Sequence, residues 1–361
     1  MSIQDAEKTS VCIYREDGVS LAICTYNGIS RLKETIQSIL KQETEGKVNW
    51  ELLIIDNAST DNTAAFVTQI WPTDRLQQLR IIREEKLGAI HARQRAIREA
   101  RYSYLSYVDD DNWISDNWIT EIHRIFGTYP TVGIISCPST AHLSEVPPDY
   151  FDSFKGWLAI GTRCPEEGII KQRPLSFWTA GLSLRLEAFD ALSDTDYKIC
   201  LTGRTGNQTY GGEDHELCLT LTLMGWEIYY THQTSFTHDI PPTRLTVPYM
   251  ERLIHNGGKS RAILDIYRNE YYQRPFYHPY LSLLDYLLHL CQCALKYGLK
   301  RLFGFAKAPL NPNRIGYLHA LGRVQSYFIH FSRISQAQRN IQILRSLNAS
   351  LDKSPTPTQQ P

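Results

Sequence analysis

Short apolar runs alternate with amphipathic segments through the first 140 residues of the chain. The runs at 19–24, 51–56, 79–83, 104–108 and 132–137 predict strands, and most of them end in polar residues. Between them, apolar residues recur every three or four positions near 30–40, 66–70, 89–101 and 118–126, which predicts helices. Strands that alternate with helices predict an α/β fold, with a mostly parallel sheet and helices on both faces.

The pattern changes after residue 137. Residues 138–175 hold Pro147-Pro148 and several glycines, so we expect irregular structure there. A glycine-rich loop at 203–212 precedes a helix that begins at Glu213, and a strand follows at 226–230. Helical patterns then dominate, and the chain ends in Ser, Thr, Pro and Gln. We expect a polar tail at 1–18, an α/β domain at 19–260, a helical extension at 261–348 and a disordered tail at 349–361.

Composition and charge exclude some partners. The 361 residues carry 38 Lys and Arg against 38 Asp and Glu, so there is no basic excess of the kind that drives nucleic-acid binding. Eight cysteines lack the spacing of a disulfide scaffold, which favours free thiols in a reducing compartment. Residues 1–18 contain no apolar segment typical of a signal peptide. These features predict a cytoplasmic protein.

Three adjacent carboxylates, Asp109-Asp110-Asp111, directly follow the strand at 104–108. Oxygen ligands of this kind suit Mg²⁺ or Mn²⁺, and Mg²⁺ commonly shares one or two protein carboxylates with substrate phosphates. The alternative is a solvated turn that caps the next helix. The preceding strand favours a metal site, because ligands of parallel α/β sheets bind at the carboxyl ends of the strands.

Other polar groups end neighbouring elements. Thr25-Tyr26-Asn27 and Asp56-Asn57 follow two of the predicted strands, so we expect both to lie at the same sheet edge as the aspartates. Glu213-Asp214 opens a helix after two glycines. These acids either cap that helix or supply a general base for a hydroxyl.

His238 and Arg244 come late in the α/β domain. A neutral imidazole could complete a metal site that the aspartates begin, and a guanidinium could bind a phosphate through two hydrogen bonds. The alternatives are a structural histidine and a surface ion pair, and the residues alone do not decide between them.

Together these motifs resemble glycosyltransferase family 2, whose members are inverting enzymes with the GT-A fold. The resemblance covers roughly 19–259 and lies in Thr25-Tyr26-Asn27, in the segment beginning Asp56-Asn57, in Lys86-Leu87-Gly88 through Arg93, in Asp109-Asp110-Asp111, in Thr179-Ala180-Gly181 and in Gly212-Glu213-Asp214. Gln94 departs from the pattern, which usually has Asn after the arginine. His238 and the residues that follow it resemble a bacterial exopolysaccharide subgroup, with the hormogonium-polysaccharide type of cyanobacteria as the nearest.

The resemblance implies a role for each of these residues. The catalytic residues would be Asp214, as the base, and Glu213. The metal, Mg²⁺ or Mn²⁺, would be held by Asp109, Asp111 and His238. The donor, a nucleotide-diphosphate sugar such as a UDP-sugar, would be bound by Thr25, Tyr26, Asn27, Asp56, Asn57, Lys86, Gly88, Arg93, Asp109, Asp110, Gly181 and Arg244. The acceptor would be a glycan or lipid-linked hydroxyl in bacterial surface polysaccharide synthesis.

Two further segments leave alternatives open. Leu281, Leu284, Leu288 and Leu295 share one apolar arc of a predicted helix at 280–302, which predicts either contact with a membrane surface or a partner, or packing on the α/β domain. Trp178, with Phe177, could form an acceptor platform or belong to the core.

Two other functions also use an α/β sheet and acidic residues. A nucleotidyltransferase would usually show a glycine-rich, basic loop after the first strand, and Thr25-Tyr26-Asn27-Gly28 does not supply one. A non-catalytic sugar-binding or scaffolding protein would be expected to lack the metal-binding and base carboxylates, and this chain has them all.

Overall fold

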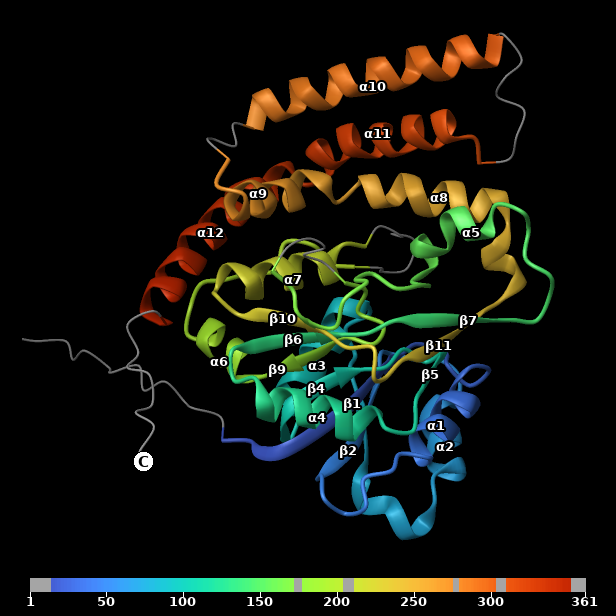
Figure 1. Cartoon of the computed structure of the whole chain (residues 1–361), viewed down its shortest axis with the longest axis vertical. Helices are drawn as coiled ribbons and strands as arrows, with labels where there is room; N and C mark the ends of the chain where they lie inside the picture. The colour runs from blue at the N-terminus through green and yellow to red at the C-terminus, as the bar shows by residue number, and fades with distance from the viewer. Residues whose placement is uncertain (1–13, 172–176, 204–210, 275–278, 303–309, 352–361) are drawn as a thin grey trace, which may run out of the picture.

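The computed structural model describes residues 14–171, 177–203, 211–274, 279–302 and 310–351. An eight-stranded sheet runs through the molecule in the order β3-β2-β1-β4-β9-β6-β10-β8, with helices on both faces (Figure 1). Pairing is parallel from β3 to β4 and antiparallel where β9 joins β4 to β6. The strands are β1 (Glu16–Thr25), β2 (Trp50–Asp56), β3 (Leu79–Arg83), β4 (Tyr102–Tyr107), β6 (Val132–Ser136), β8 (Gly168–Ile169), β9 (Ser183–Arg185) and β10 (Glu227–Tyr230). The predicted fold class, a mostly parallel α/β sheet with a helical extension, is confirmed.

The central strands are buried on both faces. In β2, Leu52 and Ile54 belong to one hydrophobic core, while Leu53 and Ile55 belong to the other. Successive side chains of a strand point to opposite faces, so an uninterrupted apolar run fills both cores at once. This explains why the sequence shows continuous rather than alternating apolar runs.

Five helices of the α/β part lie where the sequence predicts them, with bounds that differ by up to three residues, as is usual where helices fray. The helices at 73–78 and 187–193 were not predicted. The helices of this part are α1 (Leu32–Leu40), α2 (Thr63–Ile70), η1 (Thr73–Gln78), α3 (Ala89–Glu99), α4 (Trp118–Thr128), α6 (Glu187–Ser193) and α7 (Glu213–Leu223).

The prediction of irregular structure at 138–175 is wrong for much of that segment. It contains β7 (Ser139–Leu143), α5 (Phe151–Phe154), η2 (Lys155–Leu158) and β8. A second, three-stranded sheet has the order β5-β11-β7, with β5 (Asn112–Ile114) and β11 (Phe236–Ile240). These strands are short and partly polar, so they carry no clear apolar pattern. Residues 172–176 of the predicted segment, and 204–210 of the glycine-rich loop, lie outside the described residues.

The small sheet also corrects the predicted setting of His238. His238 comes after the last strand that the sequence predicts, at 226–230, but it lies within a further strand, β11, where it pairs with Asn112 of β5. Because β5 starts directly after Asp111, that pairing brings the histidine back beside the aspartates, although they are far apart in the sequence.

Helices after the small sheet cover one side of the molecule (Figure 1). The helix α9 contacts α7, and α12 contacts both α7 and α9, so these elements share a core with the α/β part. The extension is therefore not a separately packed unit. Counted from the end of the small sheet, and so from before the predicted start at 261, the extension comprises η3 (Pro242–Leu245), α8 (Val247–Gly258), α9 (Arg261–Tyr271), α10 (Pro279–Leu302), α11 (Pro312–Ile329) and α12 (Phe331–Leu351).

Both predicted tails are shorter than expected within the described residues. The strand β1 begins at Glu16, inside the predicted tail 1–18, and Arg15 forms an ion pair with Asp190 at 2.8 Å. The helix α12 continues to Leu351, past the predicted boundary at 349. Residues 1–13 and 352–361 lie outside the described residues, so the remaining parts of both predictions stay predictions.

A buried carboxylate, Glu216 of α7, joins the extension to the α/β part. It accepts hydrogen bonds from the backbone N–H groups of Cys200 and Leu201 and from the Tyr267 hydroxyl of α9. Asn340 of α12 donates in turn to the Tyr267 oxygen at 2.8 Å. Burial outweighs these donors and raises the pKa of Glu216 from 4.5 to about 7.

This shift predicts a specific pH dependence of stability. Because the folded-state pKa of Glu216 lies above its unfolded value, its stabilising contribution is complete below pH 4.5 and is lost as pH rises through 7. The loss amounts to about 3 kcal/mol. We expect the free energy of unfolding to fall less from pH 5 to pH 8 in Glu216→Gln than in the wild type, measured by urea denaturation.

The exposed Glu43 supplies the control, and Glu43→Gln is expected to behave as the wild type. Histidine titration affects all three proteins alike, so the difference between them isolates Glu216. An identical decrease in Glu216→Gln and wild type would show that this carboxylate does not titrate in the window.

Candidate active site

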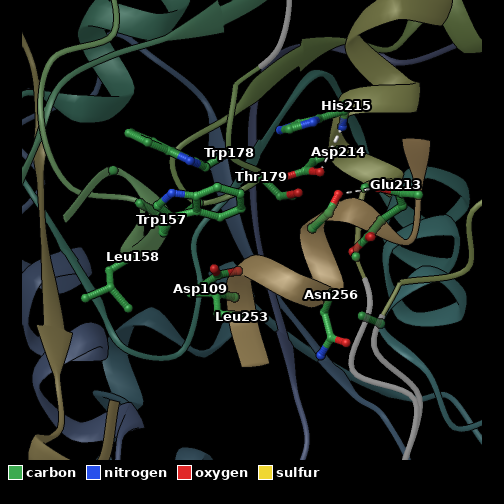
Figure 2. Close-up of a pocket in the computed structure, with 18 of the residues that line it drawn as sticks. Asp109, Trp157, Leu158, Trp178, Thr179, Glu213, Asp214, His215, Leu253 and Asn256 are labelled. Atoms are coloured by element: carbon green, nitrogen blue, oxygen red, sulfur yellow. Dashed lines mark hydrogen bonds between the residues drawn. The ribbon is translucent and has the colours of Figure 1, made fainter. Parts of the chain in front are cut away.

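A cavity of about 750 Å³ opens at the carboxyl ends of the central strands. Its walls come from the aspartate turn after β4, from the start of α7, from η2 and from the helices α8, α9 and α11. This is the edge at which parallel α/β sheets bind ligands. Figure 2 shows Asp109, Asp214 and two tryptophans, Trp157 and Trp178, around the space. The structure thus brings together several residues that the sequence separates by more than 100 positions.

The middle aspartate of the triplet is bound by protein groups. The Asp110 carboxylate accepts two hydrogen bonds from the Arg31 guanidinium, at 2.9 and 2.7 Å, and a third from the Thr25 hydroxyl at 2.6 Å. Its backbone oxygen accepts a fourth from Thr35. These contacts tie the turn to the end of β1 and to α1. They identify a structural role for Asp110 and Thr25, and donor contact by either residue stays a prediction.

The third aspartate lies against His238 and Arg244. Asp111 is 5 % exposed, and its Oδ1 lies 3.5 Å from His238 Nε2. Arg244 Nη1 approaches Asp111 Oδ2 and His238 Nε2, both at 3.1 Å. Burial acts to raise the pKa of Asp111, but His238 and Arg244 outweigh it and the pKa is lowered. Asp111 is therefore ionised, as a metal ligand must be.

The tautomer of His238 follows from its other contact. Nδ1 lies 2.9 Å from the carbonyl oxygen of Leu158, which can only accept a hydrogen bond, so Nδ1 carries the proton. Nε2 faces both Asp111 and Arg244: it donates to the Asp111 carboxylate in the imidazolium and offers a lone pair to Arg244 in the neutral imidazole. A backbone carbonyl that fixes the free nitrogen in this way is the usual support of a metal-binding histidine.

The residues fit a divalent cation that substrate phosphates complete. Among the described residues, no group of three or more His, Cys, Asp or Glu side chains is arranged to hold a metal ion. Mg²⁺ usually takes one or two carboxylates together with substrate phosphates and water, so a full cage is not needed. The predicted metal roles of Asp109, Asp111 and His238 stay predictions.

Asp109 lies on the other side of this turn, near a buried ion pair. Burial raises the pKa of Asp109, and the positive charge of Arg93 opposes that increase. Arg93 Nη1 lies 2.5 Å from Glu213 Oε1, with both side chains largely buried. Glu213 therefore has a cationic partner at the cavity wall. Arg93, predicted to bind the donor, connects α3 to the start of α7.

Asp214 differs from Glu213 in having a less enclosed carboxylate. It lines the cavity in the first turn of α7, and its Oδ1 accepts a hydrogen bond from the backbone N–H of His215 at 2.8 Å (Figure 2). The preceding Gly212 has a φ of 119°, a conformation that favours glycine. An added Cβ there would lie 2.8 Å from Ser260, which lies between α8 and α9. The glycine therefore also lets the extension pack closely against the start of α7.

The predicted nucleotide residues hold neighbouring loops together. The Asn27 side-chain oxygen accepts from Thr60 N–H, which joins the ends of β1 and β2. The Asn57 amide donates to the Lys86 carbonyl at 2.8 Å and accepts from Gly88 N–H at 2.8 Å. These bonds shape the loop before α3.

The remaining donor-binding predictions differ in their setting. Tyr26 is 46 % exposed, whereas Asp56 is buried and forms an ion pair with Arg83 at 2.9 Å. Gly181 is buried, and an added Cβ would lie 2.6 Å from the Phe236 ring, so its place is behind the cavity wall that Thr179 and Ala180 form. Neither Asp56 nor Gly181 lines the cavity, and donor contact by these residues stays a prediction.

Sequence reasoning missed the part of the wall that the extension and η2 contribute. Trp157, Asn256, Arg261, Arg268 and His319 all line the cavity. Burial lowers the pKa of His319 to about 4, and the charges of Arg261 and Arg323 add to this, so its imidazole is neutral. No motif marks these residues, because they reach the site only through tertiary packing.

The fold and the position of the cavity define an α/β protein of the GT-A type. S. aureus TarS, residues 1–349 in complex with UDP-GlcNAc, matches with a TM-score of 0.50 at 13 % identity, over 93 % of this chain and 92 % of that chain. A likeness at this identity concerns the fold alone.

The family is given by the sequence matches. The model of glycosyl transferase family 2 matches residues 20–146, so this part of the chain forms a domain of that family. Over 99 residues the chain is 32 % identical to TuaG of Bacillus subtilis, a teichuronic acid biosynthesis glycosyltransferase, and 34 % identical to WfgD of Escherichia coli, a UDP-Glc:alpha-D-GlcNAc-diphosphoundecaprenol beta-1,3-glucosyltransferase. These alignments cover 27 % of this chain, 38 % of TuaG and 37 % of WfgD.

Proposed function

We propose that this protein transfers a sugar from a nucleotide-diphosphate donor to an acceptor hydroxyl, with a divalent metal and with inversion at the anomeric carbon. One observation carries the proposal. An adjacent carboxylate and imidazole, Asp111 and His238, and a candidate base, Asp214, line the same cavity, and Asp111 lies within the matched family 2 domain. A transferase needs both groups, and a protein that only binds a nucleotide sugar has no need of the base.

The donor end of the cavity is assigned to the aspartate turn. Asp109 and Asp111, with His238 Nε2, would hold Mg²⁺ or Mn²⁺, which when bound neutralises negative charge on the diphosphate leaving group. Arg244 contacts both Asp111 and His238, so its guanidinium lies beside the position at which the diphosphate would bind. Arg31 keeps the Asp110 charge neutralised, which limits repulsion within the turn.

The acceptor end is assigned to Asp214. Its carboxylate would remove the proton from the attacking hydroxyl, and the hydroxyl oxygen would form the new bond as the bond to the diphosphate breaks. A single displacement of this kind inverts the anomeric configuration. Glu213 supports the base indirectly, because its ion pair with Arg93 fixes the first turn of α7.

The relatives support a donor and an acceptor class. WfgD is named for UDP-glucose and a diphosphoundecaprenol-linked acceptor, TuaG for teichuronic acid biosynthesis, and TarS is solved with UDP-GlcNAc. We therefore assign a UDP-sugar donor and a glycan or lipid-linked acceptor in bacterial surface polysaccharide synthesis, at the cytoplasmic face of the membrane. The exopolysaccharide subgroup that the His238 segment resembles is consistent with this assignment.

Replacing the base predicts a selective loss. Asp214→Asn keeps the size of the side chain but cannot accept a proton, so we expect transfer to fall by about 100-fold or more. Donor affinity is expected to change little, because the donor residues lie elsewhere. The measurements are the initial rate of UDP release and the Kd of the UDP-sugar by calorimetry.

The exposed Asp116 supplies a matched control, and Asp116→Asn is expected to keep wild-type turnover. If Asp214→Asn also turned over at the wild-type rate, the base would have to be another group.

The helix α10 supports a membrane-associated role. One face packs inward through Tyr286, which is buried and donates to Asp265 at 2.6 Å, and through Tyr297, which stacks on Tyr317. The opposite face exposes a stripe of leucines, each at least 41 % exposed: Leu281, Leu284, Leu287, Leu288, Leu295 and Leu299. The face that carries Tyr286 and Tyr297 therefore packs on the protein. The face that carries the leucines is the one to which contact with a membrane or a partner applies.

We assign the leucine stripe to the acyl boundary of a membrane. An apolar face on an outermost helix, flanked by Gln292 and Lys296, is typical of helices that lie in the plane of a bilayer. WfgD is named for a lipid-linked acceptor, and an enzyme that uses such an acceptor has to work at the membrane surface. No helix in the described parts of the chain is long and apolar enough to cross a membrane.

We predict that negative charges introduced into the leucine stripe will abolish binding to vesicles. The double variant Leu284→Glu with Leu288→Glu should abolish co-flotation with phosphatidylglycerol vesicles, because burying a carboxylate in the acyl region is costly. The variant Gln292→Glu, on the polar flank of the same helix, should float as the wild type does. Wild-type protein that stays at the bottom of the gradient would rule out this contact.

A further inference from the structure

Two tryptophans face the cavity in which Asp214 lies. Trp157 is 39 % exposed, Trp178 is partly buried, and both line the cavity. Figure 2 shows their indoles on the same side of the space, with Asp109 and Asp214 nearby. Large apolar rings left open to solvent inside a polar cavity usually mark a binding surface.

Trp157 is held in place by groups of the metal-binding side. The next residue, Leu158, accepts the hydrogen bond from His238 Nδ1 at 2.9 Å. Ala159 then takes a left-handed conformation, with a φ of 59°, and its carbonyl accepts from the Ser139 hydroxyl at 2.7 Å. The turn that carries the indole is therefore fixed by both β11 and β7.

The extension supports the Trp157 ring itself. An added Cβ on Gly257 of α8 would lie 2.5 Å from Trp157 Cζ3, so only glycine lets the indole reach this position. The imidazole of His319 on α11 meets the indole edge-on at 6.2 Å. Two helices and a turn therefore define where the ring lies in the cavity wall.

Trp178 faces the cavity because its side chain points away from that of its buried neighbour, Phe177. Its neighbour Phe177 is fully buried against Tyr230, with ring centroids 5.7 Å apart, so Phe177 is a core residue and the predicted platform role for it is wrong. Trp178 points the other way, and the Arg163 guanidinium lies 5.1 Å from its ring centroid.

The chemistry of this wall matches a sugar ring. A pyranose has an apolar face of C–H groups and a rim of hydroxyls, so it stacks on an indole and forms hydrogen bonds at its edge. Thr179, His215 and Asn256 supply polar groups around the tryptophans. The nearby Asp214 is the group assigned to the acceptor hydroxyl, so a ring stacked here is on the acceptor side.

We propose that Trp157 and Trp178 form the acceptor subsite, and that the acceptor presents a sugar ring rather than an acyclic polyol or a bare lipid phosphate. This inference rests on the proposed function, since it takes Asp214 as the acceptor-side base. It assigns the 138–175 segment, together with α8 and α11, to acceptor recognition.

The test separates acceptor binding from donor chemistry. Trp157→Ala and Trp178→Ala should each raise the KM for p-nitrophenyl glucoside and p-nitrophenyl N-acetylglucosaminide by about 10-fold or more. Hydrolysis of the UDP-sugar in the absence of acceptor should stay within about twofold, because that step uses the donor side alone. Trp157→Phe and Trp178→Phe should recover part of the lost affinity, which also guards against variants that fail to fold.

Trp226 provides the control, since its ring packs on Gly133 away from the cavity lining, and Trp226→Phe should leave the KM unchanged. An unchanged acceptor KM in both alanine variants would overturn the proposal. So would donor hydrolysis by the wild type with no transfer to any saccharide.

A wild type that neither binds nor hydrolyses any nucleotide sugar would instead contradict the proposed function. The subsite is tested even then, because the same glycosides should quench tryptophan fluorescence in the wild type and in Trp226→Phe. The quenching should be weaker in Trp157→Phe, and equal quenching in all three proteins would count against the subsite.

Discussion

The site depends on the neutralisation of three consecutive carboxylates at the end of a buried strand. Asp109, Asp110 and Asp111 repel one another, and an unpaired charge at this depth would be costly. Each one faces a different cation: Arg93 lies near the first, Arg31 binds the second and Arg244 the third. Since these arginines come from α3, α1 and η3, charge balance at one turn fixes the relative positions of several elements around the cavity.

Arg244, which binds the third aspartate, differs from Arg31 and Arg93 in the kinds of group that it contacts. Arg31 is committed to Asp110 through two short hydrogen bonds and a partly buried pair. Arg244 is shared between a carboxylate and an imidazole nitrogen, the two kinds of ligand that a divalent cation also binds. Asp111 and His238 would hold the metal, which would supply positive charge for the diphosphate, and Arg244 would lie beside that diphosphate.

The helical extension belongs to the active site as much as to the fold. Glu216, Tyr267 and Asn340 connect α7, α9 and α12 in one buried network, next to the helix start that presents Asp214. Through the same packing, α8 and α11 support Trp157. The helix α10 lies outside these helices and exposes its leucines (Figure 1). The helices α8 and α11 thus shape the cavity. The exposed leucines of α10 lie on the outer side of the extension, where a membrane surface could contact them.

Much of this arrangement was predictable from the sequence because it is local. Apolar runs such as 51–56 specify a doubly buried strand, and a polar turn after such a strand specifies a site at the sheet edge. The position of His238 was not predictable, since its pairing with Asn112 depends on short strands without an apolar pattern. Trp157 was missed for a related reason, because its exposure is set by Gly257 on a helix 100 residues later. The contacts of Asp110 and Asn57 likewise exist only between distant loops.

The most direct test of the account is proton NMR of the anomeric region during turnover of UDP-glucose or UDP-GlcNAc by the purified protein, with Mg²⁺ and with EDTA. The account predicts a new anomeric signal of β configuration from the α-linked donor, present with Mg²⁺ and absent with EDTA. A first-formed product of α configuration, or an equal rate in EDTA, would contradict it.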